Sequence, residues 1–278
     1  MVFTLEGQRR ASLLGASENA ASGSRVVKSG FLPASIEFDR VRVVLVASRN
    51  PLNIGAAARA MSNFGFQHLR VVNPYDVAFR EARSAVGASA LLAHAEEFES
   101  VPEAVADCVL VVGTTAVRHR ELQQPLRSLH QGARLIREQL RSGRVALLFG
   151  SEKVGLSNRD LSHCHWVMNI PTREEHASMN LGQAVAVCLY ELASGGKAPQ
   201  SGKHEPRAAA SELERMTGML LDALRASGYV HPGTEASTEQ KVRQLIRRLN
   251  LQAGDAEIWL GMLKQIVWKL RPGESAQR

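Results

Sequence analysis

Apolar residues follow two patterns that alternate along the chain. Five short segments are rich in apolar residues, at 41–46, 68–72, 108–112, 145–149 and 165–170. Such runs are typical of strands buried on both faces of a parallel sheet. Helices are expected between and after them, at 53–64, 101–107, 128–141 and 178–192. The alternation of strand and helix predicts an α/β domain with a mostly parallel sheet.

Both ends of the chain differ from this central part. Residues 1–38 are rich in Ser, Ala and Gly without a sustained period, so we expect a disordered N-terminal tail. The α/β domain is expected over 39–194, followed by a linker at 195–210 whose composition is rich in Gly, Ala and Pro. Beyond it, 211–278 is expected to form a small helical extension, with helices at 211–227, 238–249 and 255–270.

Length and composition narrow the class of protein. With 278 residues, 45% of them hydrophobic and 22% charged, the chain can bury the core of one large domain or two modest ones. No apolar run is long enough for a membrane helix, and no secretory signal is recognisable at the N-terminus. Three scattered cysteines do not suggest a disulfide framework. We therefore expect a cytoplasmic protein with no membrane association.

The charge favours a polyanionic partner. Lys and Arg number 34 against 27 Asp and Glu, a net charge of +7. Seven arginines fall between 118 and 144, and a second basic cluster lies at helical spacing over 241–248. A solvated helix face would explain such runs equally well. Because the arginine fork matches phosphate oxygens, we expect RNA contacts from five of these residues, namely Arg118, Arg120, Arg127, Arg243 and Arg247.

Common cofactor and metal signatures are missing. Gly150 and Gly155 have P-loop spacing, but Leu156 stands where that loop requires lysine, and no G-x-G-x-x-G follows the first strand. The sequence His163-Cys164-His165 would alternate across a strand, and no second ligand pair stands at suitable spacing. We therefore expect no metal site and no dinucleotide site.

Three segments at expected strand ends remain as candidates for chemistry. They are 53–59, 149–156 and 170–180. Ligands of open α/β sheets bind outside the carboxyl ends of the strands, so these segments are expected to line one crevice. Local explanations exist for each segment, such as close helix packing at Gly55 or an N-cap at Ser178.

These three segments resemble the signature motifs of the SPOUT methyltransferases, in particular the SpoU/TrmH-type RNA ribose 2′-O-methyltransferases. The resemblance extends from about residue 41 to residue 270 and includes 111–115, 180–185, 213–215 and 259–264. Within that family it is strongest to enzymes that methylate nucleotide 32, a cytidine or uridine, in the tRNA anticodon loop. A ribosomal RNA ribose methyltransferase, a non-catalytic RNA-binding relative and an unrelated nucleotide-binding α/β enzyme are the alternatives.

The resemblance implies a fold and a site. It implies a trefoil knot in the C-terminal part of the catalytic domain, a homodimer with its sites at the interface, and S-adenosylmethionine as cofactor. The cofactor would contact eight residues, namely Thr114, Thr115, Ala116, Gly150, Ile170, Ala177, Ser178 and Met179. The catalytic group would be Arg59, Glu152, Ser178 and Asn180. Since a guanidinium stays protonated, we expect Arg59 to stabilise developing negative charge rather than to act as the base.

Overall fold

The computed structural model describes residues 36–74, 79–80, 90–116, 122–173, 175, 178–195 and 206–270. All of them belong to one compact unit that spans 32–278. Arg118, Arg120 and Ala177 lie outside the described residues, as do most of the expected tail and linker.

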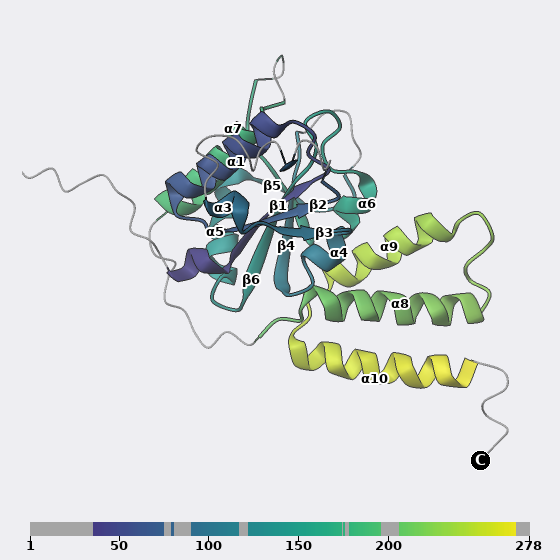
Figure 1. Cartoon of the computed structure of the whole chain (residues 1–278). Coiled ribbons are helices and arrows are strands. Elements are labelled where there is room, and N and C mark those ends of the chain that lie inside the picture. Colours follow the sequence, from purple (N-terminus) through teal and green to yellow (C-terminus); the bar gives the residue numbers. More distant parts are fainter. Residues whose placement is uncertain are drawn as a thin grey trace, which may run out of the picture. The chain divides into compact units, whose positions relative to one another are not determined.

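A seven-stranded sheet forms the centre of the α/β domain (Figure 1). Its order is β3-β2-β1-β6-β4-β7-β5, and each of its strand pairings is parallel. The strands are β1 Val41–Val46, β2 His68–Val72, β3 Glu96–Phe98, β4 Cys108–Thr114, β5 Leu126–Ser128, β6 Arg144–Phe149 and β7 Trp166–Asn169. The prediction of an α/β domain with a mostly parallel sheet is confirmed.

Both faces of the sheet are covered by helices. The helices of the α/β domain are α1 Pro51–Phe64, α3 Ala90–Ala93, α4 Val101–Ala104, α5 Leu129–Gln139, α6 Asn158–Ser162 and α7 Leu181–Ser194. Alternation along β1 directs Val43 into the core beneath α1, α5 and α7, and Val44 into a second core on the opposite face. Because both faces are buried, the central strands are almost entirely apolar.

Local signals fix the ends of α1, the helix that carries the first candidate segment. The side chain of Asn50 accepts a hydrogen bond from the Leu52 amide, and Pro51 occupies the first turn. Gly65 ends the helix in the left-handed conformation, with φ of 78°. The helix therefore begins two residues before the predicted 53–64 and ends as predicted.

The extension consists of α8 Ala210–Ala226, α9 Glu235–Arg248 and α10 Ala253–Leu270. Figure 1 shows α8 between α9 and α10, and a separate small core joins these helices. At the start of α8, the Ser211 amide donates a hydrogen bond to the Ala106 carbonyl of the α/β domain, 3.1 Å away. Among the described residues, no helix has the length and apolarity that a bilayer crossing requires.

The structure departs from the sequence expectations at several short elements. A 3₁₀ helix, Ile36–Arg40, precedes β1, and its Phe38 is buried and stacks on Phe66 with ring centroids 4.6 Å apart. The expected start of the domain at 39 therefore falls inside this helix. Strands β3 and β5 were not expected, because three residues are too few to show a period.

Candidate active site

A cavity of about 390 Å³ opens at the carboxyl ends of β4, β6 and β7. It is lined by the end of β4, the loop after β6, the segment after β7 and the start of α7. Seven of the eight residues expected to contact a cofactor line it, namely Thr114, Thr115, Ala116, Gly150, Ile170, Ser178 and Met179. Glu152, expected in the catalytic group, lines it as well.

Hydrogen bonds hold the end of β4 at this cavity. The Thr114 hydroxyl donates to the Leu148 carbonyl on β6 at 2.9 Å. The Thr115 amide donates to the Met168 carbonyl on β7 at 3.0 Å. The polar wall of the cavity is therefore anchored to two neighbouring strands.

The loop after β6 is a tight turn that requires glycine. The Gly155 amide donates to the Ser151 carbonyl at 2.8 Å, and Gly155 itself has φ of 69°. A Cβ added to Gly150 would lie 2.0 Å from the Gly155 carbonyl carbon. Gly150 and Gly155, which have the spacing of a P-loop in the sequence, therefore serve to form this tight turn.

Asn53 connects the three candidate segments. Its Nδ2 donates to Oε1 of Glu152 at 3.1 Å, and its Oδ1 accepts from Nδ2 of Asn180 at 2.7 Å. The Arg49 amide donates to the other oxygen of Glu152 at 3.4 Å. Asn53 was not predicted as a site residue, although its position at the head of the first segment was the signal that could have identified it.

Asn180 also begins α7. Its Oδ1 accepts from the amides of Gly182 at 2.9 Å and Gln183 at 3.4 Å. The N-cap of this helix is therefore Asn180, not Ser178, which lines the cavity. Close packing of α7 on α1 occurs two residues further along, where a Cβ on Gly182 would lie 2.5 Å from the Cβ of Ala56.

Arg59 lies outside the group that borders the cavity. It is exposed on α1, two turns after Asn53, and is not among the cavity-lining residues. Within the described part of the chain, its side chain forms no hydrogen bond or ion pair. Its guanidinium is therefore available to a ligand or to another chain.

Three of the arginines predicted to contact RNA, namely Arg127, Arg243 and Arg247, lie among the described residues. Among them Arg127 is half-buried, with its guanidinium carbon 5.8 Å from the ring centre of Trp166. Arg243 and Arg247 are only 5% and 1% exposed. The prediction that these two residues contact RNA is wrong for this structure, because α8 and α9 bury them against each other.

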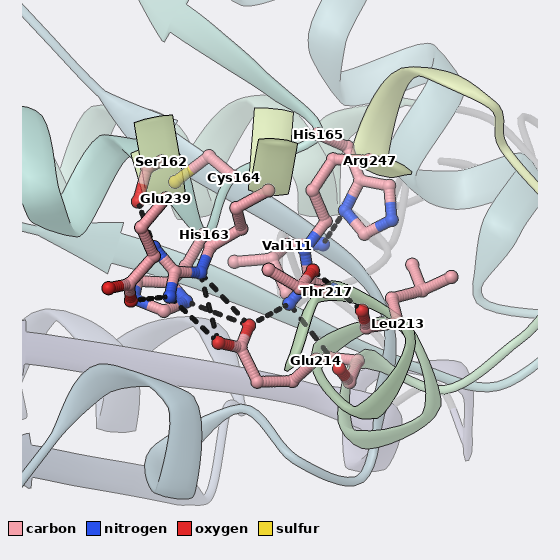
Figure 2. A network of polar contacts seen from close by, with 12 residues as sticks. Val111, Ser162, His163, Cys164, His165, Leu213, Glu214, Thr217, Glu239 and Arg247 are labelled. Carbon is pink, nitrogen blue, oxygen red and sulfur yellow. Dashed lines mark hydrogen bonds and ion pairs between the residues drawn. The ribbon is translucent and has the colours of Figure 1, made fainter. Parts of the chain in front are cut away.

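Both arginines form buried polar contacts instead, and Figure 2 shows Arg247 beside Glu214 in this network. Arg243 forms an ion pair with Glu214 of α8 at 2.9 Å and donates to the Ser162 hydroxyl at 3.2 Å. Arg247 lies 3.4 Å from the same Glu214 carboxylate. Helical spacing places both arginines on one face of α9, and that face points into the protein.

The His163-Cys164-His165 sequence is part of the same buried region. Burial lowers the pKa of His163, lowers that of His165 to about 3, and raises the pKa of the Cys164 thiol to about 12. Nδ1 of His165 accepts from the Val111 amide at 3.1 Å. In the part of the chain that the structure describes, no three metal-ligating side chains gather.

Comparison with known proteins gives consistent matches. Residues 40–190 match the SpoU rRNA Methylase family. The tRNA (cytidine/uridine-2'-O-)-methyltransferase TrmJ of Escherichia coli strain K12 is 35% identical over 234 residues, covering 81% of this chain and 94% of that protein. The protein of the same name from Cronobacter sakazakii is 34% identical over 235 residues, with 81% and 95% covered.

Solved structures agree with these sequence matches. The crystal structure of TrmJ from Z. mobilis ZM4 has a TM-score of 0.71 and 35% identity, and the match covers 81% of this chain and 98% of that chain. A probable methylase family protein from Haemophilus influenzae Rd KW20 has a TM-score of 0.51 and 28% identity, with 84% and 98% covered. The chain therefore belongs to the SpoU rRNA methylase family, a family of methyltransferases.

Proposed function

We propose that the protein transfers a methyl group from S-adenosylmethionine to the ribose 2′-hydroxyl of nucleotide 32 in the tRNA anticodon loop. The observation that carries this proposal is identity of 34–35% to tRNA (cytidine/uridine-2'-O-)-methyltransferases over nearly their whole length. The cavity supports it, because residues of two candidate segments, 149–156 and 170–180, line it, and Asn53 of the first segment donates a hydrogen bond to the cavity-lining Glu152. With tRNA as substrate, the protein acts in the cytoplasm.

The residues around the cavity fit this cofactor. A volume of about 390 Å³ lies in the range of small-molecule sites, which run from about 300 to 1,000 Å³. Ile170 and Met179 offer apolar walls, while Thr114 and Ser178 offer hydroxyl groups. When bound, S-adenosylmethionine supplies an activated methyl group on a positively charged sulfur.

The chain's own residues would align and stabilise the reacting hydroxyl. The guanidinium of Arg59 would stabilise the negative charge that develops on the ribose oxygen and hold the adjacent phosphate, which, with water, offers an acceptor for the proton. Asn180 and Ser178 would orient the ribose or Arg59. Glu152 would order the loop after β6, a role supported by its hydrogen bond with Asn53.

We also propose a homodimer with the active sites at its interface. Arg59 does not line the cavity of its own chain and has no partner among the described residues. At such an interface, Arg59 of one subunit would lie beside the cavity of the other subunit. Cross-linking Arg59→Cys to a cavity residue of a second, differently tagged copy would test this arrangement.

A trefoil knot is the topology we propose for the segment around 170–190. Two features support it: β7 lies between β4 and β5, and the chain then returns through α7 to pack on α1. Joining residue 36 to residue 270 through a linker would close the chain. A knotted chain would remain compact after chemical unfolding, unlike an unknotted ring of the same length.

Ribosomal RNA is the second candidate substrate, because the description of the matched family names rRNA methylases. Transfer of labelled methyl from S-adenosylmethionine to unmodified tRNA and to ribosomal RNA transcripts would separate the two. We expect label on tRNA only. Label on ribosomal RNA alone would retain the reaction and refute the substrate, and label on neither would refute the proposed function.

A further inference from the structure

Among the residues that the structure describes, helix α10 is covered on one side only. Ala256 and Leu263 are buried against the core of the extension, which they share with residues of α8. Figure 1 shows α8 beside α10 and no other labelled element along its opposite side. On that uncovered surface, Ile258, Met262 and Ile266 are 63%, 47% and 47% exposed.

Charged residues continue this apolar stripe at both ends. Asp255 precedes Ile258 by three positions, and Lys269 follows Ile266 by three. The five residues Asp255, Ile258, Met262, Ile266 and Lys269 are therefore spaced by three, four, four and three positions, which keeps them on one face of a helix. We call this set the α10 stripe.

The spacing of the α10 stripe is symmetric about Met262. Reversing the helix direction leaves the apolar positions unchanged and exchanges the negative end for the positive end. A two-fold interface requires such self-complementarity, because the same surface serves both partners. The symmetry therefore identifies a second copy of this chain as the fitting partner.

We propose that α10 pairs antiparallel with α10 of a second copy, with the two-fold axis passing beside Met262. Ile258 would pack against the partner subunit's Ile266, and Asp255 would lie beside the partner subunit's Lys269. Because of the two-fold symmetry, this charge pair forms twice. This contact involves the extension alone and is separate from the interface proposed around Arg59.

Charge distinguishes this arrangement from others. In a parallel pair, Asp255 would face a second aspartate, which is repulsive. Neither Asp255 nor Lys269 has an ion-pair partner among the described residues, so both are available for the pairing. An RNA backbone would meet three apolar side chains, one carboxylate and a single lysine on this stripe, a poor surface for phosphate.

Cross-linking at the symmetry axis tests the proposal directly. The three native cysteines are buried, so Met262→Cys introduces a single accessible thiol on the described surface. Packed helices lie about 8–10 Å apart, a span suited to a short bismaleimide. Lys264→Cys is the matched control, since Lys264 is exposed on another face of the same helix.

We expect cross-linked dimer from Met262→Cys and only background from Lys264→Cys. Equal yields from both variants, or no dimer from either, would overturn the proposal. In the Met262→Cys background, Asp255→Lys should lower the yield at limiting protein concentration about fivefold, since two surface ion pairs are lost. Adding Lys269→Asp should restore it.

A second measurement excludes RNA as the occupant. Ile266→Glu should abolish the Met262→Cys cross-link and leave the affinity for tRNA unchanged. If the cross-link is absent and Ile266→Glu weakens tRNA binding, the stripe contacts tRNA and the helix pairing is wrong.

Discussion

Asn180 and Asn53 lie 127 positions apart in the sequence, yet the side-chain amide of Asn180 donates a 2.7 Å hydrogen bond to the side-chain oxygen of Asn53. The other end of the Asn53 amide donates to Glu152. One side chain thus connects the start of α7 to the loop after β6. The same Asn180 caps α7, so stability and site geometry depend on different atoms of one residue.

Substitutions at Asn180 should separate these two roles. Asn180→Asp keeps the oxygen that caps α7 but replaces the Nδ2 donor, so we expect an unchanged or higher melting temperature together with slower methyl transfer. Asn180→Ala loses both, and we expect about 1 kcal/mol of destabilisation in addition to slower transfer. Thermal unfolding and turnover should be measured on the same preparations.

One outcome would contradict a positioning role for the contact between Asn180 and Asn53. If Asn180→Asp transfers methyl groups at the wild-type rate, the contact between Asn180 and Asn53 has no part in positioning the site.

Because α7 contacts α1 closely at Gly182, replacing this glycine should destabilise the protein. A Cβ on Gly182 would lie 2.5 Å from that of Ala56, so Gly182→Ala should lower the free energy of unfolding by about 1–3 kcal/mol. The control is Gly218→Ala within α8, where a Cβ meets nothing within 4 Å and the higher helix propensity of alanine should stabilise by up to about 1 kcal/mol. Denaturant unfolding curves of both variants would check the opposite signs.

Glu214 should make the extension sensitive to acid. Burial by itself raises the pKa of this carboxyl, but the contacts with His163 and Arg243 outweigh it and lower the pKa to about 2. A depressed pKa adds stability above the ordinary value of 4.5, and this stability is lost as the pH falls toward 2. Glu214→Gln should remove that part of the pH dependence.

At neutral pH the same substitution leaves two buried arginines without their shared carboxylate. We expect Glu214→Gln to cost about 3 kcal/mol. Glu257→Gln, at an exposed position on α10, is the control and should change stability little. Equal unfolding curves for the two variants would show that the buried ion pairs contribute nothing.

The central strands were predictable from sequence because parallel strands buried on both faces are almost purely apolar. Strand β1 was predicted with its observed bounds for this reason. Strands β3 and β5 lie at the two edges of the sheet, where three residues each form the pairing and only one neighbour is present. Their sequences carry no period that separates them from loops.

The residues expected to contact a cofactor mostly line one cavity, whereas two of the residues expected to contact RNA are buried. The resemblance pointed to Gly150, where the backbone approaches closely, and to Ile170 as an apolar wall, and both line the cavity. It gave no reason to separate a surface arginine from a buried one. Arg243 and Arg247 follow helical spacing in either case, and their inward direction becomes visible only with their partners in the fold, among them Glu214 on α8 and Ser162.

Arg59 provides the test of the proposed chemistry. Arg59→Ala removes the positive charge expected beside the reacting oxygen, and removing one such donor typically costs about 10²–10³ in rate. Because the side chain is exposed and unpaired among the described residues, the melting temperature should not change. Ser62→Ala, exposed on the same helix, is the control, and a variant Arg59→Ala that keeps more than about a tenth of the turnover would contradict the assignment.

Nucleotide-resolved mapping of the methyl group on tRNA tests the central claim most directly. Unmodified tRNA transcripts would be incubated with the protein and S-adenosylmethionine, digested and examined for ribose methylation at each position. We predict 2′-O-methylation at nucleotide 32 with the wild-type protein and its loss with Arg59→Ala. Methylation of a base, or of a ribose elsewhere in the tRNA, would contradict the account.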